Sequence, residues 1–168
     1  MLNIDDTFDA VHSGQQLRLF NARYDEYGFQ PIVVFDGAGR FVNAILRPAK
    51  RPSGVEISTH LRRLVQAIRP NWPTTPIQIR ADSHNCNPQV VDRCPANAID
   101  FILHLAPTTT SRKHVTDLEA STTARLERSK TGKVRRFKEI LDDAGSWSRV
   151  ERIIASVEVS GPGRWHPL

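Results

Sequence analysis

Two short segments carry acidic residues at the points where apolar strands are expected to end. Asp5 and Asp6 follow the apolar start of the chain, and Asp82 closes the run PIQIRAD at residues 76–82. Mg²⁺ prefers oxygen ligands and often takes one or two carboxylates together with phosphate oxygens of a substrate. Two such ions can hold the attacking and leaving oxygens of a phosphodiester displacement. If the two strands are neighbours, these acids form a candidate metal site; as separate residues they would cap surface turns.

The elements that must position these acids follow from the apolar pattern. Ser53 and Glu56 form a capping box ahead of an apolar face that stops at Pro70, which predicts a helix. Asn87-Pro88 is typical of a helix start. The expected elements, in chain order, are strands at 2–7, 31–36 and 40–48 (the last two a hairpin), a helix between Ser53 and Pro70, a strand at 76–82, a short helix at 87–94, a strand at 98–106, a helix at 111–128, and an extended pair at 133–141 and 148–159.

This order of elements defines the expected fold class. Three antiparallel strands followed by alternating helices and strands predict a mixed sheet with helices on its faces. The order matches the ribonuclease-H-like fold, in which the first and fourth strands lie side by side. We therefore expect an α/β protein: a ribonuclease-H-like mixed sheet with flanking helices and a C-terminal extended (β) insertion. Residues 8–29 show a mixed pattern and are expected to form a long, partly extended excursion.

Composition narrows the class of protein. The chain has 168 residues, of which 39% are hydrophobic and 24% charged, enough for one domain with a core. No run approaches the roughly 18 to 20 apolar residues of a membrane span, and the N-terminus lacks the pattern of a signal peptide. Two cysteines, Cys86 and Cys94, are too few for a disulfide scaffold and fit a reducing compartment. We expect a cytoplasmic protein without a membrane segment.

Basic residues gather in two parts of the chain, after an acidic start. The net charge is +5, yet residues 1–30 carry five acids against two arginines. An acidic spot in basic surroundings suits a polyanionic substrate whose phosphate meets a bound metal; an ordinary solvated surface is the alternative. The candidate DNA-binding residues are Arg47, Lys50, Arg51, Lys133, Arg135 and Arg136.

Four segments together resemble the group-one DDE transposases of bacterial insertion sequences: NIDDTFDAVHSGQ, YGFQPIVVFDGAGRFVNAILRPA, LVQAIRPNWPTTPIQIRADSHN and ANAIDFILHLAPT. The family's D-x-T element matches Asp5-Asp6-Thr7, and its R-x-D-S element matches residues 80–83. The resemblance implies that Asp5 and Asp82 are catalytic metal ligands with Asp6 as a neighbour. It also implies Mg²⁺ (or Mn²⁺) as cofactor and duplex DNA, at transposon ends, as partner. The implied function is DNA transposition by metal-dependent phosphodiester cleavage and strand transfer.

The chain departs from this family pattern in ways that bear on activity. Asn3 stands where the family commonly has a further Asp. The third acid of the family's site, a glutamate on a late helix, has no counterpart, because the late glutamates fall in the extended segment; they are Glu139, Glu151 and Glu158. We therefore expect a truncated copy that does not cleave DNA alone. Its expected parts are a partial catalytic domain at 1–130, an extended insertion at 131–160 and a divergent tail at 161–168.

Three other interpretations remain open from the sequence. The chain could be a non-catalytic DNA-binding module that keeps the fold and the basic surface. A haloacid-dehalogenase-like phosphatase uses a D-x-D-x-T loop, but here Asn3 occupies the position of the nucleophilic Asp. His84, Cys86 and Cys94 are zinc-type ligands, although their spacing fits no standard zinc motif.

Overall fold

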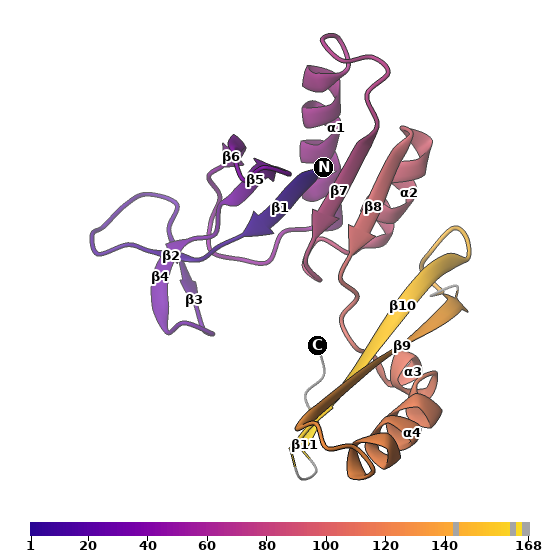
Figure 1. Cartoon of the computed structure of the whole chain (residues 1–168). Helices are drawn as coiled ribbons and strands as arrows, with labels where there is room; N and C mark the ends of the chain where they lie inside the picture. Colours follow the sequence, from indigo (N-terminus) through magenta and orange to yellow (C-terminus); the bar gives the residue numbers. More distant parts are fainter. Residues whose placement is uncertain (143–144, 162–163, 166–168) are drawn as a thin grey trace. The chain divides into compact units, whose positions relative to one another are not determined.

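The computed structural model describes residues 1–142 and 145–161, together with the backbone of 164–165 (Figure 1). The chain forms two compact units, Met1–Leu105 and Ala106–Leu168. The boundary predicted from the sequence, at residue 130, separates segments of expected function, whereas the division at residue 105 separates compact units. Most of the predicted tail at 161–168 lies outside the described residues. No helix in the described ranges is long and apolar enough to cross a membrane.

The first unit is built on a five-stranded mixed sheet. Its strands are β1 (Leu2–Asp6), β5 (Ile32–Asp36), β6 (Phe41–Ile45), β7 (Ile77–Ala81) and β8 (Ile99–Leu103), in the spatial order β6-β5-β1-β7-β8. β1 is antiparallel to β5, and β5 to β6, whereas β1, β7 and β8 are mutually parallel. The predicted mixed sheet is confirmed, including the side-by-side placement of the first strand and the strand that precedes Asp82.

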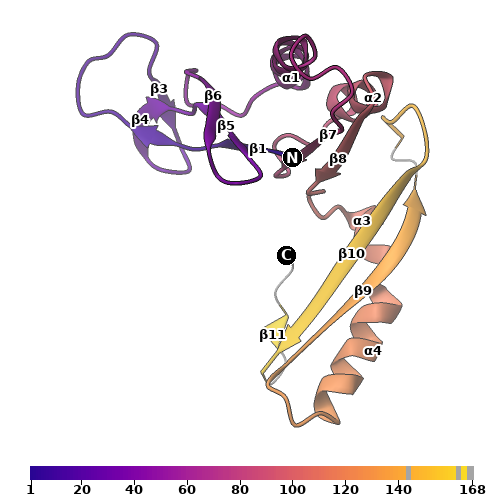
Figure 2. The same cartoon turned by 45° about the horizontal axis from the view of Figure 1, so that its top comes forward.

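Two helices cover one face of this sheet, α1 (Gly54–Ile68) and α2 (Pro88–Ala96) (Figures 1 and 2). Both predicted starts are confirmed: Ser53 and Glu56 form a complete capping box, and the Asn87 side chain accepts from Val90 N–H. The core between helices and sheet is apolar; it includes Ile4, Val34, Ile57, Leu61, Leu64, Ile79, Val90 and Cys94. The packed helices thus hold the strands, and the ends of the strands, in fixed positions.

Residues 9–29 form a small second sheet, which the sequence pattern did not predict. Its strands are β2 (Asp9–Ala10), β3 (Leu19–Asn21) and β4 (Glu26–Phe29), in the order β2-β4-β3. Phe20 pairs edge-to-face with Tyr27 across β3 and β4. A side chain at Gly28 would come within 2.3 Å of the Asp9 carbonyl oxygen, so the strands approach too closely for any other residue. Such short strands are too brief to show a period of two.

The second unit packs a helical segment against a long hairpin. Its elements are α3 (Thr109–Lys113), α4 (Thr116–Glu127), β9 (Lys133–Asp142), β10 (Glu151–Ser160) and β11 (Arg164–Trp165). The expected extended pair is an antiparallel hairpin. The run DDAGSW at 142–147, which predicts its turn, lies partly outside the described residues. The helix expected at 111–128 is two helices, because the backbone of Val115 is non-helical (φ −115°, ψ 1°). Leu118 of α4 is buried against Val157 and Val159.

A buried histidine in α1 makes the first unit sensitive to acid. His60 is 4% exposed, and its Nε2 has no hydrogen-bond partner among the described residues. Burial, together with the nearby charge of Arg63, lowers the pKa of His60 below its ordinary value of 6.5. The unfolded chain therefore takes up this proton more readily, and stability falls as the pH drops below about 6.5.

We expect the thermal midpoint of unfolding to decrease when the pH is lowered from 7.5 to 5.5. In His60→Leu this decrease should be smaller. The Leu side chain keeps the volume but cannot be protonated, so the loss of up to about 1.4 kcal/mol per pH unit disappears. Thermal unfolding followed by circular dichroism at both pH values measures the difference, with the exposed His12→Leu as control. An equal pH dependence in His60→Leu and the natural chain would show that His60 is not the source of the acid sensitivity.

Candidate active site

The ends of β1 and β7 bring the predicted acids to one edge of the sheet. The two strands are parallel, with Ile4 opposite Ala81. Continuing this register by one residue sets Asp5 level with Asp82, which directly follows β7. Packing of the helices against the sheet fixes both strands, and the backbone at these two acids is therefore fixed as well.

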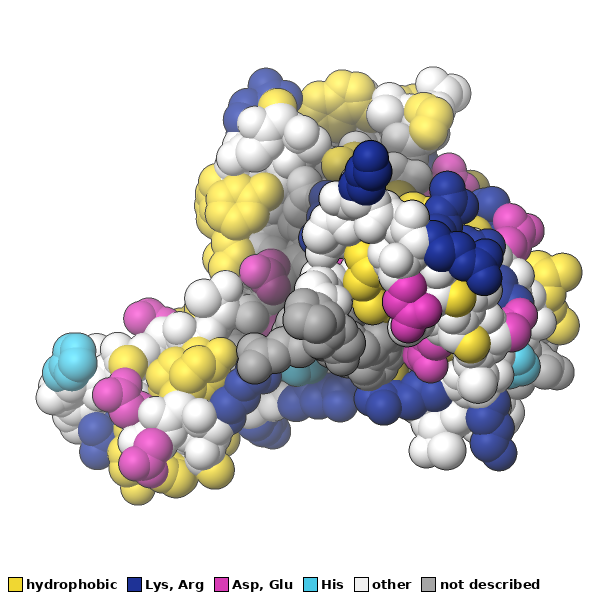
Figure 3. Space-filling view, turned by 60° about the horizontal axis from the view of Figure 1, so that its bottom comes forward, with side chains coloured by type: hydrophobic (Ala, Val, Ile, Leu, Met, Phe, Trp, Pro, Cys, Tyr) yellow, Lys and Arg dark blue, Asp and Glu magenta, His cyan; other side chains and the backbone are white. Residues whose placement is uncertain are grey.

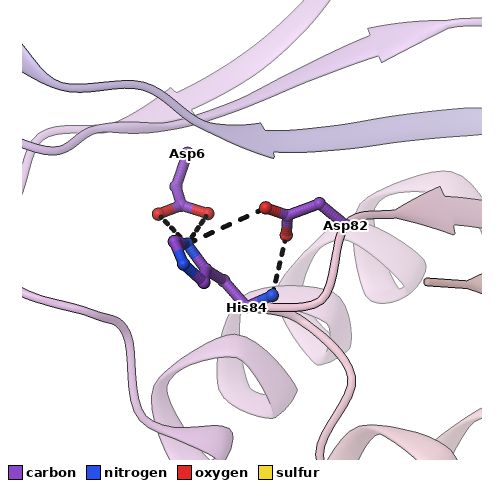
Figure 4. Close-up of side chains that lie close together, drawn as sticks. All are labelled: Asp6, Asp82 and His84. Carbon is purple, nitrogen blue, oxygen red and sulfur yellow. Dashed lines mark hydrogen bonds and ion pairs between the residues drawn. The ribbon is translucent and has the colours of Figure 1, made fainter. Parts of the chain in front are cut away.

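Asp6, Asp82 and His84 form a close group at this edge (Figure 4). One ligand atom of each lies within 4.8 Å of the others. His84 Nδ1 is 3.0 Å from Asp6 Oδ2 and 3.8 Å from Asp82 Oδ2. Carboxylate oxygens with one imidazole nitrogen suit a divalent cation such as Mn²⁺. Within the described part of the chain, no other three His, Cys, Asp or Glu side chains lie close enough to share one ion.

The alternation of β1 places its two terminal acids on opposite faces. Asp6 lies on the same face as the core residues Leu2 and Ile4, and its side chain has no exposed surface. Asp5 lies on the other face and is exposed, with its Oδ1 accepting from the Asp6 N–H at 3.0 Å. Asp5 is thus open to a substrate, whereas Asp6 faces the protein.

The electrostatics of Asp5 favour a bound cation. Partial burial of its carboxyl raises the pKa of Asp5; the Asp6 N–H hydrogen bond opposes this, and the negative charges of Asp82 and Asp6 add to it. Asp5 and Asp82 follow the paired residues Ile4 and Ala81 on neighbouring strands, so their negative charges repel at this edge of the sheet. A cation between such carboxylates relieves the repulsion and favours the charged form of both.

Asp6 belongs to a buried chain of hydrogen bonds behind the acids. Gln30, which is 7% exposed, donates from Nε2 to Asp6 Oδ2. The Gln30 carbonyl in turn accepts from Arg47 Nη1 at 3.2 Å. Arg47 is 4% exposed and pairs with Glu56 at 3.0 Å. Burial disfavours the charged form of Glu56, but hydrogen bonds from Arg47 and Ser53 N–H outweigh this and lower its pKa overall.

The predicted DNA-binding residues of the first unit fall into two kinds. Lys50 and Arg51 are exposed in the segment before α1, and Arg51 Nη2 donates to the Ser83 carbonyl at 3.3 Å, beside Asp82. Arg47 is instead buried with its guanidinium used inside the protein. Arg51 therefore supplies positive charge beside Asp82, and Lys50 is the exposed cation next to it in the chain.

The predicted DNA-binding residues of the second unit are largely paired. Lys133 Nζ is 2.6 Å from Glu158 Oε1, and Arg135 contacts the other oxygen of the same carboxylate. Arg136 donates to Ser121 Oγ at 2.7 Å, on α4. On the face that Figure 3 shows, dark-blue and magenta side chains are likewise intermixed in several places. Paired charges contribute less to phosphate binding than free ones.

The late glutamates are also engaged within the second unit. Glu139 pairs with Arg152 at 2.9 Å, Glu151 with Arg149, and Glu158 with Lys133 and Arg135. The guanidinium of Arg152 lowers the pKa of Glu139 below its ordinary value. Each of these carboxylates thus already has a cationic partner on the hairpin or next to it.

The structure does not favour the zinc site or the phosphatase site that the sequence left open. Cys94 is fully buried in the apolar core, and burial raises the pKa of the Cys86 thiol, which disfavours the thiolate that zinc requires. Asn3, at the position of a phosphatase nucleophile, donates from Nδ2 to the Asp36 carbonyl at 3.1 Å. Its amide therefore serves the sheet and offers no nucleophilic oxygen.

A mixed sheet in this strand order, with acids where two neighbouring parallel strands end, is the arrangement expected of ribonuclease-H-like proteins. Comparison with protein families matches residues 1–166 to the transposase DDE domain of group 1. The chain belongs to that family, which confirms that the motifs are those of a DDE transposase domain. No curated protein sequence matches the chain significantly.

A solved transposase structure supports the fold. The chain is similar to the piggyBac transposase in its synaptic complex with hairpin DNA, with a TM-score of 0.50 and 11% identity over 82% of this chain. It spans 28% of the length of that protein. A second similar structure is a simian T-cell lymphotropic virus intasome in complex with the PP2A regulatory subunit B56 gamma, with 14% identity over 76% of this chain and 43% of that one, and a TM-score of 0.38. The predicted fold class is confirmed.

Three residues at the site were not predicted to act there. Gln30 lies in a strand connection with no polar pattern, and Asn85, whose Nδ2 donates to Asp82 Oδ1 at 2.8 Å, lies in a turn. From the sequence alone, His84 is a candidate ligand only for zinc, together with the two cysteines. A signal for His84 did exist, because it follows the R-x-D-S element directly. Nothing in the sequence pairs it with Asp6, which is 78 residues away.

Proposed function

We propose that this chain is the metal-binding part of a DDE transposase catalytic domain, in which Asp5 and Asp82 hold Mg²⁺ or Mn²⁺ for phosphodiester chemistry on duplex DNA. The observation that carries this proposal is the parallel pairing of β1 and β7, which sets the two acids of the family's motifs level at one edge. Membership of the family supports the chemistry. We further propose that the protein acts in the cytoplasm, on the ends of a transposable element.

The residues of the site have different proposed roles: some bind the cation, some bind DNA, and some position the others. A bound divalent cation would supply Lewis acidity to the scissile phosphate and would lower the pKa of an attacking water. Asp5 and Asp82 supply the negative charge that holds the cation, and Lys50 and Arg51 draw the DNA backbone toward them. Asp6 and Gln30 hold the His84 ring beside Asp82. Each contribution depends on strand ends that the core keeps rigid.

Two carboxylates are fewer than the family's chemistry requires, because two hard cations must be neutralised and held in a fixed geometry. All three late glutamates have cationic partners within the second unit. We therefore propose that the isolated chain binds a cation and DNA without cleaving DNA. The same observation favours the second candidate function, a DNA-binding module without catalysis.

The test is incubation of the chain with a supercoiled plasmid that carries the ends of the parent element, in Mg²⁺ or Mn²⁺. We expect no nicking and no excision above the level of Asp82→Asn. Cleavage by the natural chain that is absent from Asp82→Asn would show a complete active site, and would mean that one of the late glutamates supplies the third carboxylate. Glu139→Gln, Glu151→Gln and Glu158→Gln would then identify it.

A further inference from the structure

The carboxylate of Asp82 is held by its own loop. Its Oδ1 accepts two hydrogen bonds, from His84 N–H at 3.0 Å and from Asn85 Nδ2 at 2.8 Å. The backbone N–H of Asn85 also donates to the Asp82 carbonyl at 3.2 Å. A carboxylate oxygen that accepts two N–H bonds has little capacity left for a cation, whereas Oδ2 accepts neither bond. The loop thus distinguishes the two oxygens of Asp82.

Asn85 has the properties of a rigid support. It is 1% exposed, and its backbone carbonyl accepts from Asn87 Nδ2 at 3.3 Å. Asn87 is the N-cap of α2, so a chain of hydrogen bonds links the start of that helix through Asn85 to Asp82. The Asn85 amide orientation is fixed by chemistry, because a carboxylate cannot donate and only the NH₂ group can face it.

The carbonyl oxygen of the Asn85 amide is unfavourable for the stability of the fold. Its Oδ1 is buried and has no hydrogen-bond partner among the described residues. A buried acceptor without a partner is unfavourable. An apolar side chain of similar size would avoid that penalty, so the amide needs a reason other than packing.

We propose that Asn85 is a positioning residue for the candidate metal site: it holds Asp82 Oδ1 so that Oδ2 is the atom offered to the cation. This inference rests on the proposed function, since it assumes that Asp82 is a ligand. Partners that orient a ligating carboxylate typically change metal affinity by about 10- to 100-fold. A purely structural residue would change stability and affinity together.

The experiment compares Mn²⁺ affinity and thermal stability in the full chain. Asn85→Leu keeps the volume, removes the donor and also removes the unpartnered acceptor. We expect its Mn²⁺ affinity, titrated by the electron paramagnetic resonance signal of free Mn²⁺, to fall about tenfold while its thermal midpoint stays at or above that of the natural chain. Asn85→Ala, which leaves space instead of bulk, is the second variant and should lose affinity to a similar degree.

Asn97→Ala is the matched control, because it removes an asparagine hydrogen bond at the opposite end of α2, from Asn97 Nδ2 to the Arg93 carbonyl, and Asn97 is not part of the chain of hydrogen bonds that leads to Asp82. It should leave Mn²⁺ affinity within about twofold, because it changes α2 without changing the partners of Asp82. Unchanged affinity in both Asn85 variants, in a chain where Asp82→Asn abolishes binding, would overturn the role of Asn85 and leave the proposed function intact. Unchanged affinity in Asp82→Asn would overturn both.

Discussion

Replacing Asp82 by Asn is expected to abolish measurable Mn²⁺ binding. The substitution keeps the shape of the side chain but removes the negative charge of one of the two proposed ligands. Loss of a partner that only orients a ligand costs about 10- to 100-fold in affinity, and loss of a ligand itself should cost at least ~100-fold. Isothermal titration calorimetry with Mn²⁺ measures the effect, and Asp5→Asn should behave in the same way.

A matched control lies at the far edge of the same sheet. Asp36 is the last residue of β5 and lies opposite Leu2, at the start of β1, whereas the candidate site lies where β1 and β7 end. Asp36 pairs with Arg40 at 2.7 Å. Asp36→Asn should leave Mn²⁺ binding unchanged. Equal loss of affinity in Asp36→Asn and Asp82→Asn would show that the ion binds through general negative charge.

The sequence was most informative where the apolar pattern was long. The five strands of the main sheet and helices α1 and α2 were predicted because each buries a face that shows in its periodicity, as in the run from Ile57 to Val65. The pairing of the strands before Asp5 and Asp82 followed from their order. The small sheet at 9–29 could not be predicted, since its strands are two to four residues long.

The site was predicted only in part, for a different reason. Motifs give the positions of Asp5 and Asp82 because they are contiguous in sequence. The partners that surround these acids are set by tertiary contacts: His84 meets Asp6 across 78 residues, and Gln30 meets it across 24. Arg47 illustrates the same limit: it is predicted to bind DNA because it lies in a basic segment, and in the structure it is buried and pairs with Glu56.

Binding of the chain to duplex DNA is expected to weaken about a hundredfold between 50 mM and 200 mM salt. This figure corresponds to about four phosphate contacts, because each neutralised phosphate contributes about −0.9 to the slope of log affinity against log salt. Arg51 supplies exposed positive charge beside Asp82, and Lys50 supplies a second exposed cation next to it in the chain. Lys50→Gln with Arg51→Gln should reduce the slope by about 2 units.

Fluorescence anisotropy with a labelled duplex of arbitrary sequence measures this dependence. Arg40→Gln is the control, because Arg40 pairs with Asp36 at the far edge of the sheet and should leave the slope unchanged. Affinity that is the same at both salt concentrations would show that these charges do not form a DNA surface. An unchanged slope in the Lys50 and Arg51 variant would move the DNA contacts to other residues.

The most direct test of the proposed site is the position of Mn²⁺ in a crystal of the chain soaked with the ion, located by anomalous scattering. We predict a peak bound by carboxylate oxygens of both Asp5 and Asp82, at about 2.0 to 2.4 Å, with Asp6 still accepting from Gln30. A peak bound by Asp6 and His84 without Asp5, or no peak at this edge of the sheet, would contradict the assignment of Asp5 and Asp82 as the metal ligands.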